Sequence, residues 1–397
     1  MKDFDVDDLL KSVFEKERQI DLRQVFEDKL EEYNISKTKA LKLLKIDKDV
    51  FEDIINGEAK QPNLIHVIKL AEFLEVNIET FIQEVIKNQK SDNIKSIESA
   101  RKTRFILQNF DVKQLTKLGF FDAKDDTDTL INKVLHFFGL ESIHDYEKEL
   151  VKPLFSKTKR HFSDKMKEFW VKSAYATFKA IDNPNPYSRN QLKDLIVKLK
   201  PYTQDVDNGL CTVSKALYNV GVTVIFQDYL STTQVRGGTF YVYDKPCIVI
   251  TDFNKKYSTL WFTLMHELHH VLFDLELIET NNYHLTGNDD LFLIEEKANS
   301  FARDYFLPIE KFKYIKSYIN NPYLVQKFAN DHEIHVSLVY TFYTWYMKNM
   351  YNKNYHGAFK DFYPNYKKAV SKLNPITWNN EKLSEVVIKI KRVLELK

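Results

Sequence analysis

Residues 261–273 form an almost continuous apolar stretch that is interrupted by a threonine, three histidines and a glutamate. Apolar side chains at most helical positions predict a helix that is buried on nearly all sides. Titratable groups inside such a helix need partners, because burying them unpaired is unfavourable. His266 and His270 are spaced i, i+4, so their imidazoles leave one face of the helix and converge. A shared metal ion would satisfy both rings, and the alternative is an ordinary pair of core or surface histidines.

The pattern H-E-x-x-H places Glu267 next to the first histidine, where a carboxylate can act as a general base beside a metal. A catalytic zinc ion usually takes three protein ligands and keeps one position open. A second helix is predicted over residues 294–302, with Glu295 and Asn299 one turn apart. We expect Glu295 to bind the ion, or Glu296 if the phase of the helix differs by one residue. Asn299 is expected to orient one of the ligand histidines through a hydrogen bond. The alternative is that Glu295 and Glu296 belong to an ordinary acidic helix face exposed to solvent.

Before the histidine helix the pattern changes to that of β-strands. Runs of β-branched and aromatic residues cover residues 222–226, 239–243 and 247–251. Arg236-Gly237-Gly238 and Asp244-Lys245-Pro246 separate them, and Ser258 or Thr259 is the expected N-cap of the following helix. The order predicts a small domain with a short three-stranded sheet, whose edge can bind a substrate backbone as an added strand.

The N-terminal part has a helix-turn-helix pattern. Short helices are predicted over Ser36–Leu44 and Asp47–Ile55, followed by a third over Leu64–Leu74. The second helix holds four acids against one lysine, whereas the first is basic, so contact with DNA phosphates is expected without obvious base readout. The alternative is a helical module for dimerisation, as in a homodimer, or for partner binding. The candidate contacts to double-stranded DNA are Lys37, Lys39, Lys42 and Lys48.

The rest of the chain is predicted to be helical, so the fold class is α+β and mostly α. Lys87–Asn93 is expected to be a linker, Leu307-Pro308 to end a helix, and Glu381–Glu395 to form the last, amphipathic helix. The expected regions are a helix-turn-helix bundle at 18–87, a helical middle region at 94–218, a metal-binding domain at 219–346 and a helical extension at 347–397.

Composition excludes several classes of protein. The formal net charge is only +2, so any basic surface must be local. The acidic N-terminus does not resemble a signal peptide, and the chain has no stretch of about 18 apolar residues, which predicts a cytoplasmic protein without membrane contact. Two cysteines, Cys211 and Cys247, are too few for a disulfide framework or a cysteine-rich zinc site.

Two stretches resemble known families. Ser36–Phe81 resembles the XRE-type helix-turn-helix family, and Lys45 stands where the turn of that family usually carries glycine. Residues 210–345 resemble the ImmA/IrrE metallopeptidase family, a small zincin. Matching segments in the first are Ala40-Leu41, Asn56-Gly57, Pro62 and Leu70–Leu74; in the second they are Val235–Thr239, Trp261–His270, Glu295–Ala302 and Phe328–Trp345.

The combination resembles the long HigA-like regulators. It implies a cytoplasmic prokaryotic regulator or antitoxin-type protein that cleaves a partner protein, commonly a repressor, or another component of a toxin system. It also implies Zn²⁺ held by His266, His270 and Glu295, with Glu267 as the base. His269, Tyr283, His284 and Arg236 are candidate oxyanion or substrate contacts, and His269, where the family often has glycine, is expected to face solvent. The alternative is a DNA- or partner-binding regulator whose zincin domain is a sensor or scaffold with little turnover.

Overall fold

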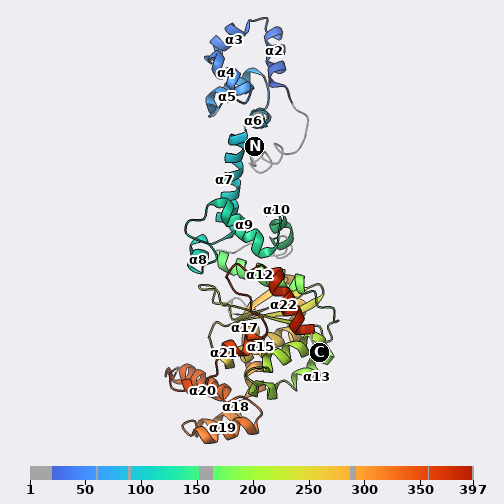
Figure 1. Cartoon of the computed structure of the whole chain (residues 1–397), viewed down its shortest axis with the longest axis vertical. Helices are drawn as coiled ribbons and strands as arrows, with labels where there is room; N and C mark the ends of the chain where they lie inside the picture. Colours follow the sequence, from blue (N-terminus) through green and yellow to red (C-terminus); the bar gives the residue numbers. More distant parts are fainter. Residues whose placement is uncertain are drawn as a thin grey trace. The chain divides into compact units, whose positions relative to one another are not determined.

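The computed structural model describes residues 20–59, 61–87, 91–151, 164–286, 292–355 and 357–395. The protein is α+β and mostly helical, with one four-stranded sheet (Figure 1). Its chain divides into two compact units, residues 1–104 and 105–397, and the division falls within α7 (Ser91–Asn109). Among the described residues, no helix combines the length and the apolar character needed to cross a membrane.

The first unit is a bundle of short helices around Phe26, Phe51 and Phe81, which are almost completely buried. The three helices predicted at 36–44, 47–55 and 64–74 are present as α3, α4 and α5, each within one residue at either end. The helix α3 ends at Leu44, and its C-cap is Lys45, whose left-handed backbone (φ 50°) costs about 1 kcal/mol relative to glycine. The helices are α2 (Leu22–Glu32), α3 (Lys37–Leu44), α4 (Lys48–Ile55), α5 (Leu64–Phe73) and α6 (Ile78–Lys87).

The second unit places helices before and after a central sheet. Before it come α8 (Val112–Lys117), α9 (Thr127–Phe138), α10 (Ile143–Tyr146), the π-helical turn η1 (Glu147–Val151), α12 (Lys165–Ile181), α13 (Arg189–Ile196), η2 (Lys200–Gln204) and α14 (Gly209–Asn219). From the sheet onward come α15 (Tyr257–Phe273), α16 (Leu275–Asn281), α17 (Phe292–Phe306), α18 (Ile309–Lys316), α19 (Pro322–Asp331), α20 (Val336–Tyr351), η4 (Lys360–Phe362), α21 (Tyr366–Ser371) and α22 (Leu383–Glu395).

The sheet has the strand order β1-β3-β2-β4. Its strands are β1 (Thr223–Gln227), β2 (Gly237–Val242), β3 (Lys245–Thr251) and β4 (Tyr283–Thr286). The first and third strands pair in parallel, and the other two pairings are antiparallel. The prediction of three strands is therefore wrong by one, because β4 has only four residues, too few to form a recognisable run of strand-forming residues.

Side chains on the two faces of the sheet enter different cores. On β1, Ile225 packs into the core formed with α12 and α22, whereas its neighbours Val224 and Phe226 pack into the core formed with α15. The helix α22 also packs against α12 and α14, so helices from before and after the sheet share one core (Figure 1). On β2 and β4, this alternation directs Thr239, His284 and Thr286 toward α15.

Several predicted boundaries differ from the structure. Ser91–Asn93, expected in a linker, lies in α7, and the last helix begins at Leu383 rather than Glu381. Lys245 and Pro246 belong to β3, because Tyr243 and Asp244 make the turn with positive φ at both positions, the geometry that suits a tight hairpin. The N-cap of α15 is Lys256, and neither Ser258 nor Thr259 caps it. The helix end predicted at Leu307-Pro308 is confirmed, since α17 ends at Phe306.

Candidate metal centre

The H-E-x-x-H segment lies in α15, whose side chains are buried on nearly all sides. His266 and His270 leave the same face of this helix, and their Nε2 atoms are 3.1 Å apart. Both imidazoles are almost completely buried. Apolar neighbours along the helix fix its position, and the i, i+4 spacing brings the two nitrogens together.

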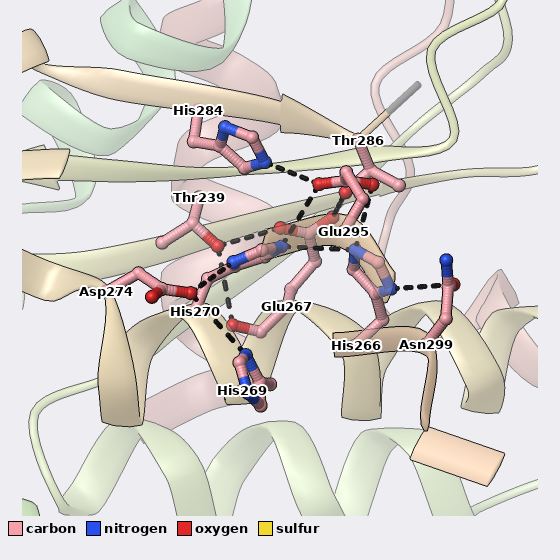
Figure 2. A network of polar contacts seen from close by, with 10 residues as sticks. All are labelled: Thr239, His266, Glu267, His269, His270, Asp274, His284, Thr286, Glu295 and Asn299. Atoms are coloured by element: carbon pink, nitrogen blue, oxygen red, sulfur yellow. Dashed lines mark hydrogen bonds and ion pairs between the residues drawn. The ribbon is translucent and has the colours of Figure 1, made fainter. Parts of the chain in front are cut away.

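The helix α17 brings a third donor to the same point. Glu295 places Oε2 3.4 Å from Nε2 of His266 and Oε1 3.4 Å from Nε2 of His270 (Figure 2). Two ligands bound tetrahedrally at zinc distances lie about 3.3 Å apart, so this donor set fits a single four-coordinate ion. Glu296 is exposed, so the helix phase favours Glu295 as the donor.

Each ligand imidazole has a partner on its other nitrogen. Nδ1–H of His266 donates to Oδ1 of Asn299 at 3.1 Å, the orienting contact expected from the sequence. Nδ1–H of His270 donates to Oδ2 of Asp274 at 2.9 Å, and this partner was not predicted from the sequence. Asp274 follows His270 by four residues, at the C-cap of α15, and this i, i+4 spacing could have indicated the contact. Both contacts leave Nε2 with its lone pair toward the donor set.

The charges of the cluster favour a cation at its centre. Burial opposes the charged form of His270, but hydrogen bonds with Asp274 and Glu295 outweigh it and raise its pKa to about 9. Burial alone would raise the pKa of Glu295, yet the surrounding imidazoles hold it well below its usual range. The two carboxylates therefore stabilise positive charge at this point, which a metal ion would supply.

Glu267 lies beside the donor set and is completely buried. Its Oε2 accepts a hydrogen bond from Oγ1 of Thr239 at 2.8 Å, and its Oε1 accepts one from Oγ1 of Thr286 (Figure 2). A Cβ atom at Gly237 would lie 2.8 Å from Oε1 of Glu267. The strands β2 and β4 thus hold the carboxylate through two hydroxyls and one glycine, and the role of Thr286 could not be found without β4.

His284 joins the cluster from β4. Its Nε2–H donates to Oε1 of Glu295 at 2.6 Å, and it pairs in register with Thr239 on the neighbouring strand. Of the candidate oxyanion or substrate contacts, it is the one that reaches a carboxylate of the donor set.

The other three candidate contacts lie elsewhere. His269 is buried, not solvent-facing, with its ring packed against Phe273 and Phe301. Tyr283 is adjacent to His284 on β4 and so faces the opposite side of the sheet, where its ring stacks on Phe240. Arg236 is exposed, with its guanidinium over the ring of Phe253.

The candidate DNA contacts belong to the first unit and differ in their surroundings. Lys37 forms an ion pair with Glu52, and its ammonium lies 4.6 Å from the ring centre of Phe51. Glu52 also pairs with Arg23, and the two cations lower its pKa to about 2. The side chain of Lys37, which is 33% exposed, is therefore already paired within the module. By contrast, Lys39, Lys42 and Lys48 are exposed.

The metal centre combines a donor set for one divalent cation with a buried carboxylate next to it. Such a cluster can bind a metal ion and hold a proton beside it. Comparison with family models, curated proteins and solved structures found no match to this chain.

Proposed function

We propose that this protein is a zinc-dependent endopeptidase that acts on a partner protein. The observation that carries the proposal is the donor set of His266, His270 and Glu295, whose contacting atoms lie 3.1–3.4 Å apart. Two imidazoles and one carboxylate suit zinc, and three protein ligands leave a position for substrate or water. A bound zinc ion would polarise the scissile carbonyl and lower the pKa of water.

Glu267 is the general base of the proposed reaction. Its carboxylate accepts a proton from the attacking water and delivers it to the leaving amine. Hydroxyl groups of Thr239 and Thr286 fix the orientation of this carboxylate, since each donates to one of its oxygens. Both hydroxyls come from strands, so the base is held by a rigid support rather than by a loop.

His284 is the residue to which we assign contact with the substrate carbonyl. Its imidazole donates to Glu295, a residue of the donor set, from the side of the sheet. An N–H group at this position is suited to stabilise negative charge that develops on the carbonyl oxygen.

We propose a partner protein as the substrate because the same chain carries a helix-turn-helix pattern in its first unit. The resemblance to XRE-type and ImmA/IrrE proteins supports a cytoplasmic regulator that cleaves a repressor or a component of a toxin system. Two short helices, α3 and α4, that follow each other closely in the first unit support this proposal.

A substrate-trapping experiment tests the proposal. The Glu267→Gln variant should keep its zinc and lose cleavage, so a pull-down should retain an uncleaved partner that the wild type cuts. Glu296→Gln is the matched control, because Glu296 is an exposed neighbour of the ligand Glu295. Protein purified without chelator that contains no zinc would refute the proposal, as would a Glu267→Gln variant that cleaves at the wild-type rate.

A second candidate function is DNA binding by the first unit with the metal domain as a sensor or scaffold. The exposed lysines Lys39, Lys42 and Lys48 favour it, because they can reach phosphate groups. A gel-shift assay on the upstream DNA of the gene itself, across a salt series, separates the two functions. Phosphate contacts must weaken steeply as salt rises, and no binding at low salt excludes this function for that sequence.

A further inference from the structure

A second set of donor atoms lies on the far side of His270. A ring nitrogen of His269, a ring nitrogen of His270 and a carboxylate oxygen of Asp274 all lie within 4.8 Å of one another. We propose that His269, His270 and Asp274 form a second site for a divalent cation such as zinc or cobalt, which shares His270 with the first site and binds more weakly.

His269 is the residue that points to this site. His269 is only 7% exposed, yet its Nδ1 has no hydrogen-bond partner among the described residues. Burying a polar nitrogen without a partner is unfavourable, and such groups in folded proteins usually have a reason. Nδ1 is directed at Oδ2 of Asp274, 3.5 Å away (Figure 2). A cation between the two would give the nitrogen a partner.

The distances and surroundings suit a small coordination sphere. Oδ2 of Asp274 is 2.9 Å from Nδ1 of His270 and 3.5 Å from Nδ1 of His269, close to the separation of about 3.3 Å between tetrahedral zinc ligands. The carboxylate of Asp274 is 19% exposed, which gives an ion access from solvent. The rings of Phe273 and Phe301 pack on His269 and fix its imidazole beside the carboxylate.

The shared imidazole couples the two sites. His270 faces the first donor set with Nε2 and Asp274 with Nδ1. A cation at the second site takes the place of the proton between Nδ1 and Asp274, and that proton is released to solvent. Two cations on one ring repel each other, so we expect the second ion to bind about tenfold or more weakly than the first.

Counting bound metal tests this inference without any substrate. Full-length protein stripped with chelator is titrated with Co²⁺, followed by calorimetry and by the visible absorption of the bound ion. The wild type should show two binding events. His269→Gln should lose the weaker event and keep the tighter one with unchanged affinity. His136→Gln, which removes an exposed histidine of α9, should keep both events.

The outcomes separate this inference from the proposed function. A single event in the wild type, or two events in His269→Gln, overturns the second site. His269→Ala, checked by its thermal unfolding, serves as a second variant if His269→Gln folds poorly. The existence of the second site does not depend on peptidase activity. Two events with no cleavage of any trapped partner would uphold the second site and count against the endopeptidase.

Discussion

The Thr239 hydroxyl donates a hydrogen bond to the Glu267 carboxylate at 2.8 Å, which joins β2 to the centre of α15. This contact gives the buried carboxylate one of its two hydroxyl donors. The proposed general base, Glu267, is therefore positioned by the sheet as well as by its own helix, and the contribution of the sheet can be tested independently of the candidate metal ligands.

Replacing Thr239 with valine should reduce cleavage by about 10- to 100-fold, because the carboxylate loses an orienting donor. Thr286→Val should act in the same way, since that hydroxyl donates to the other oxygen. The measurement is kcat on the trapped partner, with zinc content determined in parallel. Thr239→Ser keeps a hydroxyl and should restore most of the activity. Loss of zinc in the valine variants would show that the residues support the metal instead.

Gly237→Ala should damage both folding and catalysis. The added methyl group would lie 2.8 Å from Oε1 of Glu267 and 2.8 Å from Cγ2 of Thr263, so the base or α15 must move. We expect a loss of about 1–3 kcal/mol in the free energy of unfolding. Denaturant titration measures it. Gly357→Ala is the control, because its nearest neighbour is 3.7 Å away, at the end of the Lys360 side chain. Equal stability of the two variants would contradict the close packing.

Asn299→Ala should weaken binding of the tighter metal ion by about 10- to 100-fold, because His266 loses the partner of its Nδ1–H. The affinity is measured by competition with a chelator of known strength. Asn349→Ala, on the exposed side of α20, is the control. An unchanged affinity in Asn299→Ala would show that packing alone holds the imidazole.

Metal affinity should rise with pH throughout the neutral range. The pKa of His270 is raised to about 9, so below that value a proton competes with the metal ion for its imidazole. Each unit of falling pH should therefore weaken binding about tenfold for this proton. Chelator competition at several values between about pH 6.5 and 8.5 measures the slope. An affinity independent of pH over this interval would contradict the assigned ligand.

The first unit should lose stability in acid. The pKa of Glu52 is lowered from 4.5 to about 2 by Arg23 and Lys37, so the folded state binds its proton more weakly than the unfolded state. The stabilisation is present above about pH 4.5 and is lost as the pH falls toward 2. After allowance for solvent screening it amounts to about 1 kcal/mol. The test is the free energy of unfolding measured between about pH 5 and pH 2. In the Glu52→Gln variant this acid-induced loss should be absent, whereas the Glu72→Gln variant, altered on α5, should lose stability like the wild type.

Sequence patterns were sufficient for the elements that have strong local signals. The apolar periodicity of α15 and the i, i+4 spacing of His266 and His270 define a buried helix with two converging imidazoles. The same spacing linked Glu295 to Asn299 on α17. Runs of β-branched and aromatic residues also located β1, β2 and β3 to within a few residues, because each strand is long enough to form a recognisable run.

Contacts that join distant segments were decided by the tertiary structure. The short strand β4 carries too little pattern to be recognised, yet pairing with β2 brings Thr286 to Glu267 and His284 to Glu295. Strand pairing also turns Tyr283 away from the metal centre. His269 is buried because Phe301 of α17 covers it, which no local pattern around residue 269 reveals. The sequence by itself determined the candidate donors, since spacing within helices pairs His266 with His270 and Glu295 with Asn299. Only the packing of sheet and helices decided what surrounds them, because those partners are far apart along the chain.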